Sequence, residues 1–155
     1  IERFRSQKWR RTGLIWWNLI DGWPQLSDAV VDYYYNKKIA YSFIKRSQEP
    51  VALMMKEPKD GFLTLIAANE FLKNIILKYK VTELTKQAVI TESETSIGSN
   101  GISELYKIQF DERNNRFYVL EWEYDGKKYI NHYISGAVPY DFNKYVAWLK
   151  EAELI

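Results

Sequence analysis

An acid and an indole follow the most apolar stretch of the chain. Residues 14–20 run almost without polar interruption, and Asp21, Gly22, Trp23 and Pro24 end the run abruptly. An acid and an indole beside two chain-breaking residues are typical of the rim of a binding site, since loops at strand ends carry binding and chemistry. Indole rings stack on the apolar faces of sugars, but an aromatic side chain is also an ordinary core residue.

The elements around this segment predict how it is positioned. A continuous apolar run predicts a strand over residues 14–20 that is covered on both faces. Its alternation places Trp16 and Trp17 on opposite faces, so only one of them is expected to contact a ligand. After a loop, an N-capping Asn36 and an apolar stripe predict a helix over residues 36–48. Helix, strand, loop and helix together are typical of an α/β barrel or a doubly wound sheet.

The pattern changes at Glu49-Pro50, where we place a domain boundary between residues 1–49 and 50–155. Seven short segments with strand character follow, and no helical pattern separates them. These are residues 51–56, 62–68, 75–84, 88–96, 103–110, 116–124 and 127–135. Such a series predicts an antiparallel β-sandwich of immunoglobulin size. A last apolar stripe predicts a closing helix over residues 142–152, with Asp141 as its N-cap.

Composition excludes several classes of function. The chain has 155 residues, of which 46% are hydrophobic and 16% aromatic, so a packed aromatic core is expected. A net charge of +2 is too small to indicate a nucleic-acid partner. There is no cysteine and only one histidine, His132, so thiolate, triad and zinc chemistry are not expected, and neither is a cofactor. No stretch of the sequence predicts a membrane span or a signal peptide, and the compartment stays undetermined.

A motif in the apolar segment resembles a known family. The positions are Gly13-x-x-x-Trp17-x-Leu19-x-Asp21-x-Trp23-Pro24, followed by Ser27 and Asp32-Tyr33. They resemble the eighth barrel strand of glycoside hydrolase family 2, above all its β-mannosidase-like branch, where the strand reads W-x-L-N-D-x-W-P. In that branch an Ig-like sandwich with a closing helix follows the barrel. Ile20 departs from this pattern by replacing a usual Asn, and Asp28-Ala29 stand where Trp-Ser is frequent.

The resemblance implies a function for the segment. It implies the last helix–strand–helix unit of a (β/α)8 barrel, followed by an Ig-like antiparallel β-sandwich, from a retaining exo-β-glycosidase that is β-mannosidase-like. Trp17, Asn18, Asp21 and Trp23 are the implied substrate-binding residues, with a carbohydrate as substrate. Both catalytic glutamates would lie on barrel strands upstream, so the segment would be inactive alone. Its partners would be those barrel domains of the same chain.

Two alternatives remain open from the residues. Asp21 has Asp28 and Asp32 as candidate partners for a carboxylate pair, although loop or capping roles are the ordinary use of such residues. Residues 50–155 also fit a non-catalytic carbohydrate-binding or protein-interaction sandwich, with Trp122 or Tyr129 as stacking platforms. We further expect the isolated segment to self-associate, because a strand over 14–20 without barrel neighbours has open edges.

Overall fold

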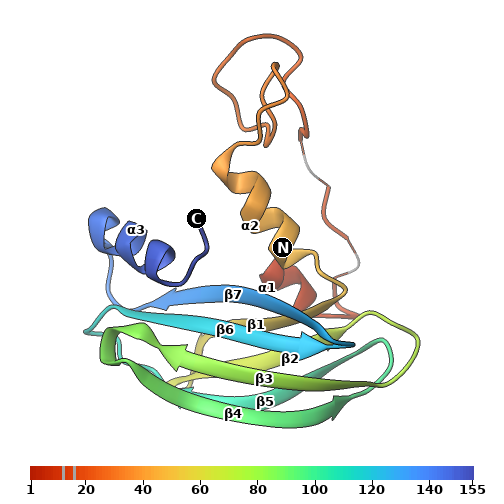
Figure 1. Ribbon diagram of the computed structural model, residues 1–155, viewed down its shortest axis with the longest axis vertical. Coiled ribbons are helices and arrows are strands. Elements are labelled where there is room, and N and C mark those ends of the chain that lie inside the picture. The colour runs from red at the N-terminus through yellow and green to blue at the C-terminus, as the bar shows by residue number, and fades with distance from the viewer. Residues whose placement is uncertain (12, 16) are drawn as a thin grey trace. The chain divides into compact units, whose positions relative to one another are not determined.

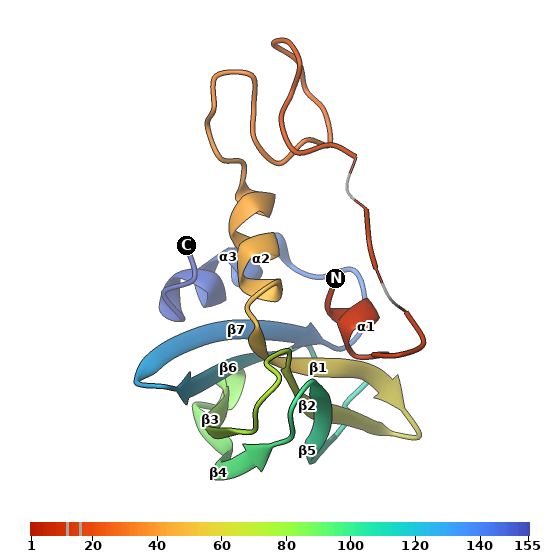
Figure 2. The same cartoon turned by 90° about the vertical axis from the view of Figure 1, so that its right-hand side faces the viewer.

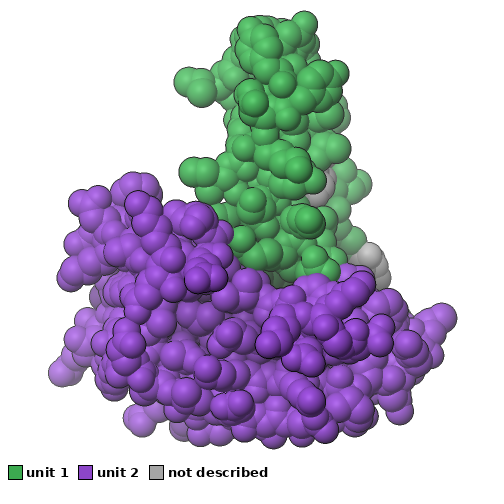
Figure 3. All heavy atoms as spheres, viewed as in Figure 1, with its two compact units in different colours: residues 1–49 green, residues 50–155 purple. Residues whose placement is uncertain are grey.

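The chain divides into two compact units at the position where the sequence pattern changes. The computed structural model describes residues 1–155 except for residues 12 and 16. Unit 1 comprises Ile1–Glu49 and unit 2 comprises Pro50–Ile155; Figure 3 colours them separately. Helix α2 of unit 1 ends at Ser47, and strand β1 of unit 2 begins at Val51.

Unit 2 is an antiparallel β-sandwich (Figures 1 and 2). One sheet has the order β1-β2-β5 and the other the order β4-β3-β6-β7, and every pairing is antiparallel. The strands are β1 (Val51–Lys59), β2 (Phe62–Asn69), β3 (Ile75–Glu83), β4 (Ala88–Ile97), β5 (Gly101–Gln109), β6 (Arg116–Tyr124) and β7 (Lys127–Ser135). A short 3-10 helix, η1 (Leu84–Lys86), links β3 to β4. The predicted sandwich is therefore confirmed.

The core of unit 2 follows from the period-2 alternation of its strands. In β3, residues Ile75, Leu77, Tyr79 and Val81 are buried, while the lysines between them point to the opposite face. Strands β1 and β2 add Val51, Leu53, Met55, Leu63, Leu65 and Ala67 to the same cluster. Their other face is also apolar, with a second buried cluster of Ala52, Met54, Ile66 and Ala68. These two strands therefore read as continuous apolar runs, whereas β3 alternates.

Helix α3 (Phe142–Glu151) packs on the sheet of β6 and β7, as Figure 1 shows. Asp141 caps it, because its side chain accepts a hydrogen bond from the Lys144 amide at 3.1 Å. Phe117 of β6 is fully buried and meets the ring of Trp148 at 5.5 Å between centroids. The closing helix begins at Phe142 as predicted and ends at Glu151, one residue before the predicted end.

Unit 1 has little regular structure. It contains α1 (Glu2–Arg5) and α2 (Ile39–Ser47), and the Arg5 guanidinium donates to the Ser47 carbonyl oxygen at 2.6 Å. Helix α2 is shorter than the predicted helix over 36–48, and its N-cap is Lys38 instead of Asn36, because Asn36 is held in the preceding turn by Asp32. The described residues of the predicted strand 14–20 form no strand, apart from a parallel bridge between Ile20 and Val31. A strand takes its ladder from neighbouring strands, and the described part of unit 1 offers this segment only that one bridge. The described residues of 14–20 therefore do not form the predicted strand, and its place in a barrel stays a prediction.

Candidate functional site

All four predicted site residues lie on the irregular segment of unit 1: Trp17, Asn18, Asp21 and Trp23. Trp17 is 83% exposed and Trp23 is 64% exposed, so both indole rings are open to solvent. Asn18 is half-buried, and its side-chain oxygen is buried without a hydrogen-bond partner among the described residues. Trp16, which was predicted to point away from Trp17, lies outside the described residues. Two exposed indoles and a buried acceptor on one short segment suit contact with a ligand or a neighbouring domain.

Asp21 differs from the neighbouring tryptophans in its burial, since its side chain is completely buried. One carboxylate oxygen accepts a hydrogen bond from the Lys38 ammonium at 2.8 Å. The other oxygen accepts a hydrogen bond from the Ser27 hydroxyl and a longer one from the Gln25 side-chain amide at 3.4 Å. The hydrogen bond from Lys38, followed by that from Ser27, holds the pKa of Asp21 below its usual range against the opposing effect of burial. The carboxylate therefore stays ionised and fastens the loop that follows it.

Lys38 was not predicted as part of this site. Its ammonium also donates to the Ser27 carbonyl oxygen at 3.1 Å, and its backbone amide donates to the Val30 carbonyl oxygen at 2.9 Å. Lysine 38 lies seventeen residues from Asp21 in sequence, so no local spacing rule links the two. The fold brings them together, and the loop from Asp21 to Lys38 is closed by this ion pair at its two ends.

A turn within that loop carries three consecutive tyrosines. Asp32 organises the turn: one of its carboxylate oxygens accepts from the Tyr34 and Asn36 amides, each at 2.8 Å, and the other from the Asn36 side chain at 2.9 Å. The hydrogen bonds from Asn36 lower the pKa of Asp32. Tyr33, Tyr34 and Tyr35 line a cavity of about 530 Å³, and Ile20, Asp21 and Gly22 complete its lining. We call this the tyrosine cavity.

The carboxylates of unit 1 do not present a reactive pair. Asp21 is buried in its ion pair, Asp32 is engaged in the turn, and Asp28 is exposed. Retaining glycosidases place two carboxyl groups about 5–5.5 Å apart facing the same bond. Asp32 holds the backbone of its turn, which is the loop role considered from the sequence, and Asp21 holds the side chains of Lys38, Ser27 and Gln25.

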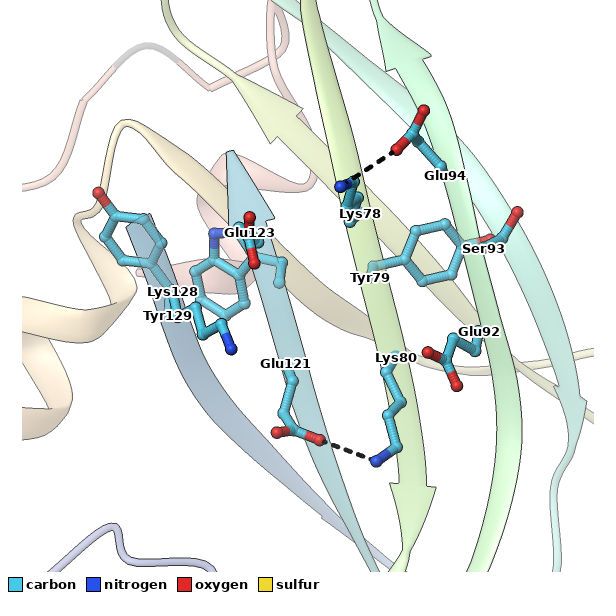
Figure 4. Close-up of a pocket in the computed structure, with 11 residues that line it drawn as sticks. Lys78, Tyr79, Lys80, Glu92, Ser93, Glu94, Glu121, Glu123, Lys128 and Tyr129 are labelled. Atoms are coloured by element: carbon cyan, nitrogen blue, oxygen red, sulfur yellow. Dashed lines mark ion pairs between the residues drawn. The ribbon is translucent and has the colours of Figure 1, made fainter. Parts of the chain in front are cut away.

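A second cavity, of about 430 Å³, lies on the β4-β3-β6-β7 sheet of unit 2, and Figure 4 shows its lining. Three lysines and four glutamates surround it. Lys78 pairs with Glu94 and Lys80 with Glu121, each at 3.8 Å, and these side chains are well exposed. Exposed pairs of this length contribute little energy, and opposite charges compensate one another across the face. The cavity has the character of a solvated sheet face.

Of the two candidate stacking platforms of the sandwich, Trp122 is buried and Tyr129 is half-buried. Trp122 is 2% exposed, and its indole nitrogen donates to the Val51 carbonyl oxygen at 3.0 Å. The rings of Trp122 and Tyr129 stack at 5.5 Å, and those of Tyr129 and Tyr124 at 5.1 Å. The rings therefore pack face to face, and Trp122 and Tyr129 reach the sheet cavity described above only as part of its lining. Trp122 is part of the hydrophobic core, and Tyr124 and Tyr129 pack against it.

The single histidine belongs to the packing of α3. His132 is half-buried, stacks on Phe117 at 5.2 Å, and shares a hydrogen bond of 2.9 Å with the Tyr145 hydroxyl. In the part of the chain that the structure describes, no group of His, Asp and Glu side chains is arranged to hold a metal ion. No helix among the described residues has the length and apolar character needed to cross a membrane.

Comparison with solved structures identifies the fold. The chain matches the β-D-mannosidase of Dictyoglomus thermophilum with a TM-score of 0.71 and 24% identity over 85% of this chain. It matches the exo-chitosanase CsxA of Amycolatopsis orientalis with a TM-score of 0.61 and 18% identity over 86% of this chain. The chain covers 17% of the length of each. No protein-family model and no curated protein matches the sequence.

The resemblance deduced from the motif is thus confirmed at the level of fold. The chain has the fold of the C-terminal portion of glycoside hydrolase family 2 enzymes, a two-sheet antiparallel sandwich with few helices. At such identities the match describes the backbone, and the roles of individual side chains rest on the contacts given above.

Proposed function

We propose that this chain is the C-terminal segment of a glycoside hydrolase of family 2, a retaining exo-β-glycosidase that acts on β-mannosides. The observation that carries the proposal is the structural match at a TM-score of 0.71 over 85% of the chain. The tryptophan and aspartate motif of unit 1 supports it from an independent direction. The segment would supply one wall of the sugar pocket, and the sandwich would brace the barrel.

The chemistry is expected to come from outside this segment. Retention requires a nucleophile and an acid/base, each a carboxyl group free to reach the glycosidic bond. The buried Asp21 and the engaged Asp32 do not meet that requirement, and unit 1 has no glutamate between Glu2 and Glu49. The proposed parent would therefore carry both glutamates upstream, and the 155-residue chain alone would not turn over substrate.

Within this proposal, the two exposed indoles contact the substrate. Trp17 would lie against the distorted sugar ring, and Trp23 would form the rim. Asn18 would offer its buried side-chain oxygen to a hydroxyl donor. Asp21 would act by fastening the rim through Lys38 and Ser27, since its carboxylate is already fully engaged. The competing function, a carbohydrate-binding sandwich, has weaker support, because its candidate platform Trp122 is 2% exposed and is stacked against Tyr129.

Hydrolysis of aryl β-mannoside by the longer protein tests the proposal. Trp17→Ala should lower kcat/KM by a factor of roughly 30 to 1,000, because a contact made in the transition state is lost. This factor corresponds to about 2–4 kcal/mol of transition-state stabilisation. Trp9→Ala is the matched control, since Trp9 is 74% exposed in the same unit but outside the motif. Turnover by the 155-residue chain alone, or unchanged kinetics in Trp17→Ala, would refute the assigned roles.

A further inference from the structure

The charged side chains of the β4-β3-β6-β7 sheet are solvated in a single chain, but their signs follow the order of the strands. Along β3 and β6 they alternate with the buried Tyr79 and Trp122, so they lie on the outer face of the sheet. We call the seven side chains that surround the cavity of Figure 4 the charged face: Lys78, Lys80, Glu92, Glu94, Glu121, Glu123 and Lys128.

The register of the sheet sets the charged face in two rows across the strands. In the first row, Lys78 of β3 lies between Glu94 of β4 and Glu123 of β6. Lys128 of β7 lies opposite Glu123 and ends this row. The second row has, in the same order of strands, Glu92, Lys80, Glu121 and Ile130. The sign therefore depends on the strand: β4 and β6 carry glutamates, and β3 and β7 carry lysines.

This order of charges is complementary to itself. A two-fold axis that runs along the strands, between β3 and β6, reverses the strand order of a second copy laid against the first. Strand β3 of one copy then faces β6 of its partner, and β4 faces β7, so that each lysine of the charged face meets a glutamate. An axis across the strands would instead lay each strand on its own copy and bring like charges together.

The ion pairs within one chain lose little when such a contact forms. Lys78–Glu94 and Lys80–Glu121 are each 3.8 Å apart, and the exposed fractions of these side chains lie between 40% and 64%, so each pair contributes little to stability. In the contact, every charge gains a partner of opposite sign, and the aliphatic stems of lysine and glutamate add apolar area. The cavity of about 430 Å³ gives the long side chains of both copies room to interdigitate. Desolvation of the charges offsets much of this gain, so the contact is expected to be weak.

We propose that the charged face is a surface through which two copies of this chain form a weak dimer that salt dissociates. Phe117 lies on the same face of β6 as Glu121, and helix α3 covers it, so the contact is confined to the charged end of the sheet. Only residues of unit 2 take part. The association is therefore independent of the proposed glycosidase activity and of the exposed apolar side chains of unit 1.

Charge swaps test the pairing of β3 with β6. Lys78→Glu with Lys80→Glu makes β3 acidic. Glu121→Lys with Glu123→Lys makes β6 basic. Each double variant alone places like charges opposite one another, and should self-associate at least about tenfold more weakly than the wild type. An equimolar mixture of the two restores opposite charges at every position, and should recover the wild-type affinity within about threefold. Sedimentation equilibrium of the 155-residue chains at about 50 mM NaCl measures these affinities.

A charge-matched pair of variants separates strand pairing from net charge. Lys59→Glu with Lys107→Glu has the net charge of the acidic variant, on exposed side chains outside the charged face. Glu57→Lys with Glu112→Lys matches the basic variant in the same way. Both control variants keep the charged face, so each should self-associate within about threefold of the wild type, and mixing them should change little. Circular dichroism should report the wild-type fold in all four double variants, because the substituted side chains are not buried.

High salt separates this dimer from association through the apolar side chains of unit 1. At about 500 mM NaCl the wild-type association through the charged face should weaken about tenfold, because exposed charges are screened, whereas apolar association persists. Unaltered self-association of the swap variants, no recovery in their mixture, or a recovery equal to that of the control mixture would each overturn the proposal. A wild-type chain that stays monomeric at about 50 mM NaCl would do the same. In those cases the charged face is solvated, or is covered by another domain of the proposed parent.

Discussion

At the scale of single residues, Asp21 shows how a carboxylate at the edge of a site can be structural. It has the position of a rim residue in the sequence, and in the fold its oxygens are taken up by Lys38, Ser27 and Gln25. Three hydrogen bonds to a buried carboxylate favour its ionised form over its neutral form. The loop from Asp21 to Lys38 therefore depends on that ionisation.

Acid should loosen this loop. The folded pKa of Asp21 is lowered, so its contribution to stability is present above the unfolded pKa of about 3.9 and is lost as the pH falls through the lower folded value. We expect the NMR signals of Ser27 and Val31 to change below about pH 4 in the wild type. In Asp21→Asn, which is neutral throughout, the same signals should already differ at pH 7 and then show no such transition.

Asp28→Asn is the control for this prediction, because Asp28 is exposed and should leave the transition in place. A wild-type transition that survives in Asp21→Asn would assign it to another group, such as Asp32, whose pKa is also lowered.

Sequence reasoning found part of the site and missed part of it for identifiable reasons. Trp17 and Trp23 stood out because two indoles flank an abrupt break in an apolar run, and both are exposed. Lys38 was missed because its partner is seventeen residues away and no periodicity connects them. The three tyrosines were visible as a run, but only the hydrogen bonds of Asp32 show that the run is a turn facing a cavity.

At the scale of elements, the strands of the sandwich were predictable and the strand over residues 14–20 was not. Alternation and turn residues such as Asp125-Gly126 are local signals, and β6 and β7 have the predicted bounds. An apolar run, by contrast, predicts only that the segment is buried on both faces. Whether it becomes a strand depends on neighbours, and here Ile20 finds only a bridge to Val31.

The packing of α3 depends on one ring of β6. Phe117 has no exposed surface and touches the rings of His132, Tyr145 and Trp148. Phe117→Ala should lower the free energy of unfolding of unit 2 by about 3–5 kcal/mol, through lost burial and the cavity left behind. Chemical denaturation followed by near-ultraviolet circular dichroism measures the change.

Phe62→Ala is the comparison for Phe117→Ala, since Phe62 of β2 is 43% exposed and should cost less than about 1.5 kcal/mol. Equal losses in the two variants would contradict the view that the ring of Phe117 anchors the helix.

At the scale of the whole molecule, the two units differ in how completely they bury their apolar side chains. Unit 2 has a continuous core between its sheets, drawn from both. Unit 1 buries Ala29, Val30 and Val31 but leaves larger apolar side chains in solvent. Those exposed side chains include Leu14, Ile15, Trp17, Leu19, Trp23 and Leu26. Several large exposed apolar side chains on one short segment indicate a surface that binds a partner or a ligand.

In the proposed parent, barrel strands upstream would cover this apolar segment, and in the isolated chain a second copy is the available cover. We therefore expect the 155-residue chain to self-associate, with a mass by light scattering that rises above 18.5 kDa as concentration increases. Ile15→Lys with Leu26→Lys should shift the chain toward the monomer, because these side chains are 93% and fully exposed and charging them costs the folded chain little. Leu72→Lys, at a leucine that is 87% exposed in unit 2, should leave the association as it was. A wild-type chain that stays monomeric at high concentration would show that the apolar segment does not need a partner, and would remove the physical reason for placing it inside a larger barrel.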